Sequence, residues 1–133
     1  MEGEEMGMTG RRMLVAFVVA LLVGAAPASF AKEGDVIREG ACSGRSDWKL
    51  KLSRENGRIE VEFEVDQNRT GRRWRVRMFH DGVRFFKGRR VTQPPSGSFE
   101  VRRVRPNHSG VDGFRARARN PRSGETCSGR ARL

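Results

Sequence analysis

Polar and apolar residues alternate with a period of two in two consecutive stretches, residues 48–52 and 59–65. This alternation is typical of a β-strand that has one face in a core and the other in solvent. Between the stretches lies Asn56-Gly57, which strongly favours a two-residue hairpin turn. Such a turn pairs Glu55 with Arg58, and the same register then places apolar residues opposite apolar ones and lysines opposite glutamates. The pairs expected are Leu52 with Val61, Leu50 with Phe63, Trp48 with Val65, Lys51 with Glu62, and Lys49 with Glu64.

Further alternating segments predict strands around residues 73–79, 83–91, 99–105, 113–119 and 127–133. Asp81-Gly82 is a second hairpin signal, Gly88 is a candidate β-bulge, and residues 36–43 could add a short edge strand. About seven strands, with turn signals about every 8–12 residues, predict a single all-β antiparallel sandwich, with a small barrel as the alternative. The side chains expected in its core are Trp48, Leu50, Leu52, Ile59, Val61, Phe63, Trp74, Val76, Phe99, Val101, Phe114 and Ala116.

The N-terminal part has the features of a secretory signal peptide. Residues 13–28 are almost purely apolar, follow two arginines and precede small residues that form an Ala-x-Ala-like cleavage site ending at Ala31. We expect residues 1–31 to be a signal peptide and residues 32–133 to be a secreted or cell-envelope domain without a stable membrane span. A retained membrane anchor is the alternative.

Two cysteines, Cys42 and Cys127, lie near the two ends of the expected domain. An even number of cysteines in a small exported domain indicates a structural disulfide. The sequence contains no C-x-x-C redox pair.

The chain carries a formal net charge of +11. Residues 1–31 hold two arginines and three glutamates, a net of −1, so residues 32–133 carry +12. Nearly all of this charge is arginine, because the expected domain has only four lysines. Such a balance favours contact with a polyanion or simple solubility, although the codon usage of GC-rich genomes also enriches arginine.

The C-terminal half resembles an immunoglobulin-like or fibronectin type III-like domain. The resemblance rests on residues 99–101, on Asp112-Gly113-Phe114-Arg115-Ala116, on Asn120 and Gly124, and on Trp74 followed by Asp81-Gly82. Phe114 stands in place of the family's corner tyrosine, and Ala116 in place of its second core cysteine. The resemblance implies a sandwich in which Cys42–Cys127 joins the first and last strands. The chain is also similar to small exported proteins of high-GC bacteria, which implies no particular function.

Arginines occupy the polar positions of two predicted strands. They are Arg73, Arg75 and Arg77 in one strand, and Arg115, Arg117 and Arg119 in the other. In an immunoglobulin-like sandwich these strands are neighbours, which would merge the six arginines into one basic face. Arg130 and Arg132 would lie on the next strand. Phe79, and either Phe85 or Phe86, would point outward near this face. The alternative is a meander in which Arg75 and Arg77 pair with Glu64 and Glu62.

Catalytic and metal-binding patterns are weak in this sequence. His80 with Asp81 could form an acid–base pair, but a histidine beside a turn aspartate usually just belongs to the turn. The glutamates at 60, 62 and 64 could hold Ca²⁺, yet the opposed lysines favour ion pairs. We therefore expect no enzyme activity, no cofactor and no metal site.

The expected function is that of a non-enzymatic exported binding module whose six arginines engage an anionic polymer. Guanidinium groups suit phosphate, sulfate and carboxylate, so a phosphate-rich wall polymer or an acidic polysaccharide is favoured over nucleic acid. The alternative is an accessory protein that packs against another exported protein.

Overall fold

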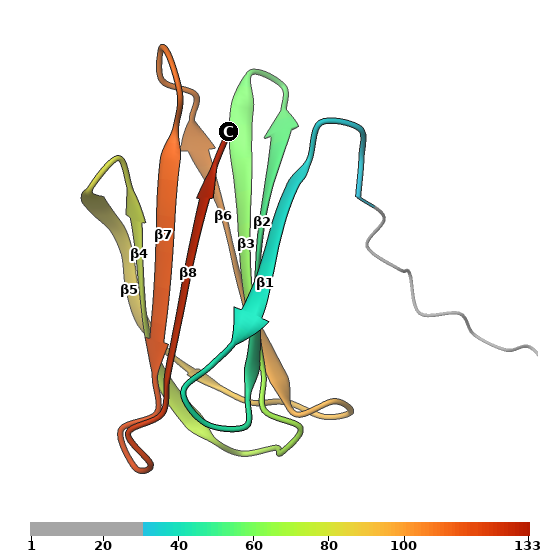
Figure 1. The fold of residues 1–133 in the computed structure, drawn as a ribbon, viewed down its shortest axis with the longest axis vertical. Helices are drawn as coiled ribbons and strands as arrows, with labels where there is room; N and C mark the ends of the chain where they lie inside the picture. The colour runs from blue at the N-terminus through green and yellow to red at the C-terminus, as the bar shows by residue number, and fades with distance from the viewer. Residues whose placement is uncertain (1–30) are drawn as a thin grey trace, which may run out of the picture. The chain divides into compact units, whose positions relative to one another are not determined.

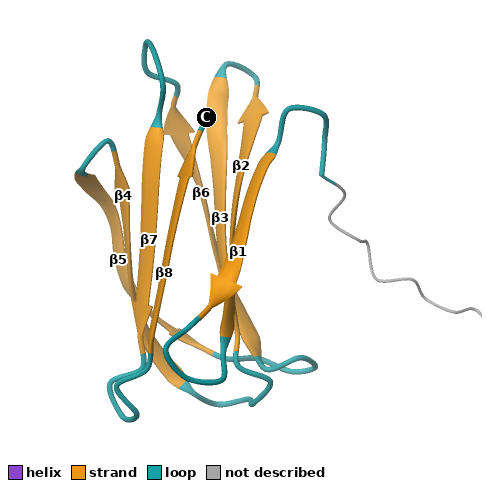
Figure 2. Cartoon of the chain, viewed as in Figure 1, coloured by secondary structure: helices purple, strands orange, loops and turns teal. Residues whose placement is uncertain are grey.

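Eight β-strands and no helix make up residues 31–133, the part of the chain that the computed structural model describes (Figure 2). The strands are β1 (Val36–Ala41), β2 (Asp47–Glu55), β3 (Arg58–Asp66), β4 (Arg73–His80), β5 (Val83–Val91), β6 (Ser98–Pro106), β7 (Gly113–Arg119) and β8 (Thr126–Arg132). They form two antiparallel sheets, a first sheet in the order β1-β2-β3-β6 and a second sheet in the order β5-β4-β7-β8 (Figure 1). The all-β sandwich prediction is confirmed.

Both predicted hairpins are present. In the turn between β2 and β3, Asn56 and Gly57 have φ values of 49° and 73°, the two positive values that a type I′ turn requires. Asp81 and Gly82 have φ values of 47° and 80° in the turn between β4 and β5. The register of β2 with β3 is the predicted one at every pair from Glu55–Arg58 to Trp48–Val65. The turn sequence and the cross-strand pairs therefore specify the same alignment.

The core lies between the two sheets and contains eleven of the twelve side chains that the sequence predicts. The exception is Trp48, which is half-buried and packs against the core from its margin. Its indole lies across β8, where a Cβ added to Gly129 would come within 2.5 Å of the ring. The core also includes side chains that were not among the twelve predicted: Val65, Met78, Ala118, Ala131 and the two cysteines.

The disulfide forms as predicted, between Cys42, directly after β1, and Cys127 in β8. It links the two sheets along the margin where β8 lies beside β1 and β2. Both cysteines are buried. A buried disulfide of this kind is typical of an oxidising, extracytoplasmic environment.

Two details differ from the predictions. There are eight strands rather than seven among the described residues, because the segment expected only as a short addition forms β1, which pairs with β2 from Asp47 to Leu52. The β-bulge of β5 is at Phe85 and not at Gly88. Met78 of β4 pairs with Phe86 and Phe79 pairs with Arg84, so Phe85 between them has no partner in β4. Gly88 pairs regularly with Val76, and its missing side chain leaves room for the Phe86 ring, which a Cβ would meet at 2.8 Å.

The predicted signal peptide, residues 1–31, lies outside the described residues except for Ala31. Within the described range no helix is long and apolar enough to cross a membrane.

Candidate functional site

The two arginine-bearing strands, β4 and β7, are neighbours in the second sheet. Their antiparallel register places Arg75 opposite Arg119 and Arg77 opposite Arg117. Between these arginines, the alternate side chains of both strands are buried in the core, so the arginines point to the outer surface. The structure thus brings the six predicted arginines onto one face: Arg73, Arg75, Arg77, Arg115, Arg117 and Arg119, all of them exposed. The meander alternative is wrong, because β4 pairs with β5 and β7 rather than with β3.

The basic surface extends over all four strands of the second sheet. On β5, Arg89 lies opposite Arg75 and Lys87 opposite Arg77, while on β8 Arg130 lies opposite Arg115. We define the basic face as the exposed cations Arg73, Arg75, Arg77, Arg84, Lys87, Arg89, Arg115, Arg117, Arg119, Arg130 and Arg132. The three cations on β5 were not among the predicted site residues, although Lys87 and Arg89 alternate in phase with the outward positions of their strand.

No aspartate or glutamate occurs in any of the four strands that carry the basic face. Within residues 31–133, none of its cations forms an ion pair with a carboxylate; the cations that do so are Lys32, Lys49, Lys51 and Arg102. Like charges on adjacent strands are destabilising. The basic face therefore retains an electrostatic cost that an anionic partner would relieve.

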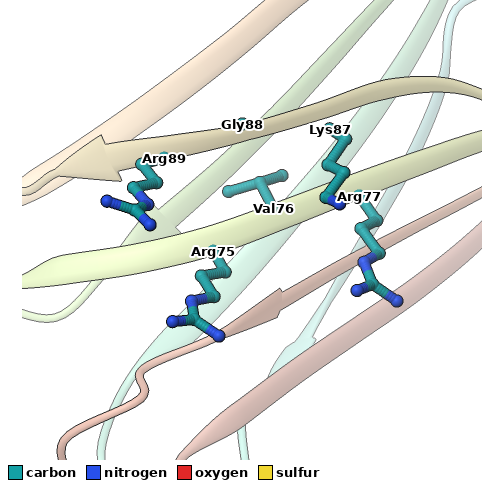
Figure 3. Close-up of a pocket in the computed structure, with 6 residues that line it drawn as sticks. All are labelled: Arg75, Val76, Arg77, Lys87, Gly88 and Arg89. Carbon is teal, nitrogen blue, oxygen red and sulfur yellow. The ribbon is translucent and has the colours of Figure 1, made fainter.

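Two shallow hollows lie among these cations. One, of about 410 Å³, has Arg75 and Arg89 toward one end and Arg77 and Lys87 toward the other, with Val76 and Gly88 between them (Figure 3). The other, of about 250 Å³, is lined by Arg75, Arg77, Arg117 and Arg119. Arg75 and Arg77 line both hollows, so an anionic chain crossing β4 would meet cations on either side.

Aromatic rings contribute less to this surface than the sequence predicts. Phe79 is half-buried on the outer side of β4, and the guanidinium of Arg115 lies 4.4 Å from the centre of its ring. The expectation of an outward ring at Phe85 or Phe86 is wrong, because both pack against the core. Phe86 is instead covered by two guanidinium groups, those of Arg90 and Arg103.

The first sheet carries acidic residues, and the glutamates of β3 form ion pairs with cations of the same sheet. Glu62 contacts Lys51 at 3.7 Å and Arg102 at 3.1 Å, and Arg102 also donates a hydrogen bond of 2.6 Å to Glu60. The hydrogen bond and the charge of Arg102 lower the pKa of Glu60. Burial, together with the nearby Glu100, raises the pKa of Glu62. The glutamates of β3 are therefore committed to ion pairs, as the sequence predicts.

Asp35 anchors the segment before β1 to the outer side of the first sheet. It accepts hydrogen bonds of 2.7 Å from Ser53 Oγ and from the backbone N–H of Lys32, and it lies 3.7 Å from the ammonium of Lys51. Burial alone would raise the pKa of Asp35, but these three groups outweigh it and hold the pKa below its ordinary value.

A second cluster, which the sequence analysis did not predict, lies at the end of the sandwich. The His80–Asp81 pair is there joined by His108 and Asp112 from the loop between β6 and β7, and their nitrogen and carboxylate oxygen atoms lie within 4.8 Å of one another. His80 and Asp81 are adjacent in the sequence, so their pairing at the turn after β4 could be expected from the sequence. The loop between β6 and β7 comes to lie beside them only because β4 pairs with β7.

No protein-family model matches this chain, and no curated protein matches it either.

Proposed function

We propose that this protein is an exported, non-enzymatic binding module whose basic face engages an anionic polymer of the cell envelope. The observation that supports this most is the charge distribution of the second sheet: eleven exposed cations on one surface and no acidic residue in the four strands. Arginines that only kept the protein soluble could be spread equally over both sheets, so solubility alone does not account for their concentration on one face.

The geometry of the basic face favours a polymer over a single small anion. Adjacent strands of a sheet are about 4.8 Å apart, and residues two positions apart on one strand are about 6.7 Å apart along the backbone, so the cations extend from a regular grid of backbone positions. A ligand with one negative group would use one corner of that grid. A chain of phosphate, sulfate or carboxylate groups would occupy several, and arginine's planar fork suits each of these groups.

Export rests on the expected signal peptide at residues 1–31 and is supported by the buried disulfide. We also propose that the sandwich is related to the immunoglobulin type. The second-sheet order β5-β4-β7-β8 corresponds to the C′-C-F-G order of that fold. In the first sheet, β2-β3-β6 corresponds to the A-B-E order, and the departures among the described strands are the additional edge strand β1 and the lack of a D strand beside β6.

A second candidate function is that of an accessory protein that pairs with another exported protein through an edge strand. It is favoured by β5, an outer strand of the second sheet that exposes Val83 and Val91. Four cations on the same strand count against it, because charged side chains on an edge discourage strand addition.

The test compares two variants that each lose four positive charges. The face variant changes Arg75, Arg77, Arg115 and Arg117 to serine, and the control variant changes the exposed Arg45, Arg54, Arg58 and Arg69 to serine, none of which is on the second sheet. We expect the purified protein and the control variant to be retained on an immobilised linear polyphosphate at low salt, and the face variant to elute early.

Equal weakening of both variants would show that bulk charge, and not the basic face, drives retention. Retention of both variants at the level of the unmodified protein would overturn the polyanion proposal and leave the accessory function. Circular dichroism of each variant checks that the sandwich is intact, since outward substitutions usually change stability little.

A further inference from the structure

Both histidines of the chain meet two aspartates at the end of the sandwich where β4 ends and β7 begins. His80 is the last residue of β4, and Asp81 begins the turn to β5. The partners, His108 and Asp112, come from the loop between β6 and β7, which lies at the same end of the sandwich as the turn from β4 to β5 (Figure 1). Four potential ligands therefore come from two segments about 30 residues apart in the sequence.

The four facing atoms are spaced as the ligands of a small cation would be. His80 Nε2 lies 2.6 Å from Asp112 Oδ1 and 3.6 Å from Asp81 Oδ2, and His108 Nδ1 lies 2.7 Å from Asp81 Oδ2 and 3.5 Å from Asp112 Oδ1. Bonds of about 2.0–2.1 Å to a tetrahedral ion place the ligand atoms about 3.3–3.4 Å apart. The two longer distances already match this, and the two shorter ones need to open by about 0.7 Å.

The remaining oxygens of both carboxylates are held by amide groups. Asp81 Oδ1 accepts a 2.7 Å hydrogen bond from the backbone N–H of Gly113. Asp112 Oδ2 accepts one of 2.9 Å from the side-chain amide of Asn107 when that amide is turned so that its nitrogen faces the carboxylate, the orientation that satisfies both ends of the amide. Asp112 is further fixed by two backbone hydrogen bonds exchanged with Leu133. Outer-shell hydrogen bonds of this kind orient the ligands of metal sites.

Charge and burial also favour a cation at the centre. The side chains of His80 and Asp112 are 0% and 1% exposed, and a buried carboxylate needs compensation by positive charge or hydrogen bonds. The two imidazoles stack in parallel with their centres 4.2 Å apart, so their lone pairs converge on one ion only when the exposed His108 ring turns out of the stack. Two neutral histidines and two carboxylates carry a charge of −2, which a divalent cation cancels.

The shortest contact of His80 is where a metal ion would replace a proton. Nε2 lies 2.6 Å from Asp112 Oδ1, and because a carboxylate only accepts hydrogen bonds, a proton or a cation has to lie between the two atoms. A bound metal ion would take that place and leave the ring proton on Nδ1, which has no hydrogen-bond partner within residues 31–133.

We propose that His80, Asp81, His108 and Asp112 form a binding site for a divalent transition metal, best matched by Zn²⁺. Two imidazole nitrogens and two carboxylate oxygens suit Zn²⁺ in a closed, four-ligand structural site, whereas Ca²⁺ prefers six to eight oxygens. His108 and Asp81 are partly exposed, at 46% and 37%, and give the ion a path from solvent. The bound ion would tie the turn between β4 and β5 to the loop before β7, at one end of the basic face.

The experiment uses the full chain without a histidine tag, stripped of metal by a chelator and then titrated with zinc in phosphate-free buffer. Asp81→Asn is the main variant, because asparagine tolerates the positive φ of this turn and keeps an acceptor for Gly113. His108→Asn is the second, and the exposed Asp47→Asn is the matched control. Substitution of the fully buried His80 is avoided, because it could unfold the protein.

We expect the unmodified protein and the control to bind one equivalent of zinc at micromolar or lower concentration and to melt at a higher temperature with zinc. Both site variants should bind at least tenfold more weakly while keeping the circular dichroism of the native sheets. Cobalt should give the intense visible bands of a tetrahedral site.

Absence of binding at micromolar zinc would show a hydrogen-bonded histidine–aspartate network and overturn the proposal, as would unchanged affinity in both site variants. Binding of calcium in preference to zinc would overturn the assignment of the metal. These outcomes are independent of the proposed polymer binding, because every arginine is retained in all three variants.

Discussion

Reduction of the Cys42–Cys127 bond should lower the free energy of unfolding by about 4–5 kcal/mol. The two cysteines are 85 residues apart in the sequence, so the bond restricts most of the unfolded chain. In the chain-entropy description, a loop of that length corresponds to about 4.6 kcal/mol. Since the total stability of a small domain is about 5–15 kcal/mol, this bond would supply a large share of it.

The assay is urea unfolding followed by tryptophan fluorescence, with and without a phosphine reductant. Trp74 is fully buried and reports the loss of the core. The reduced protein keeps both sulfur atoms, so the difference from the oxidised protein isolates the covalent constraint from packing. The double variant Cys42→Ala/Cys127→Ala is the control, and its unfolding midpoint should not respond to reductant.

A change of less than about 1 kcal/mol on reduction would refute this reasoning, since it would mean that the unfolded chain gains little freedom when the bond is broken. Alkylation of either cysteine in native protein that has not been reduced would contradict the presence of the disulfide itself.

Three further predictions concern stability. Phe63→Ala should lower the free energy of unfolding in urea by about 3–5 kcal/mol, because it leaves a cavity in the core. Arg117→Ala on the outer surface should change it by less than about 0.5 kcal/mol. Equal effects would mean that the inward and outward faces of the strands are misassigned. Gly129→Ala should lower the melting temperature, because the new methyl group meets the Trp48 ring at 2.5 Å, and an unchanged melting temperature would contradict that contact. Because the pKa of Asp35 is lowered in the folded protein, its ionised carboxylate stabilises the fold above the ordinary carboxyl pKa, and this contribution is lost as the pH falls through the folded-state pKa. Asp35→Asn should therefore make the free energy of unfolding depend less on pH in the acid range. An unchanged pH dependence would exclude this role.

The strands and hairpins were predictable because local and cross-strand signals agree. Asn56-Gly57 fixes a turn, and the pairs around Leu50–Phe63 and Lys51–Glu62 are satisfied only in the register that this turn imposes. The position of the bulge was predicted wrongly, because Gly88 was taken as its marker. The glycine is there for another reason: the Phe86 ring fills the space beside it, and this contact is visible only when side chains are placed.

The candidate sites depend on which strands are neighbours, and period-two patterns do not contain that information. The same alternation in β4 fits the meander, in which Arg75 and Arg77 face glutamates, as well as the observed sheet, in which they face other cations. His108 and Asp112 lie in a loop without any periodic pattern, so their approach to His80 follows only from the pairing of β4 with β7.

The most direct test of the central claim is the salt dependence of binding to linear polyphosphate, measured by fluorescence anisotropy for the unmodified protein and for the four-serine face variant. Each arginine that neutralises a phosphate contributes about 0.7–0.9 to the slope of log affinity against log salt concentration. We predict that the face variant has a slope smaller by about 3, whereas the control variant, altered at four exposed arginines elsewhere, keeps the slope of the unmodified protein. Equal slopes for the face variant and the unmodified protein would contradict the claim that the basic face of the second sheet is where the polymer binds.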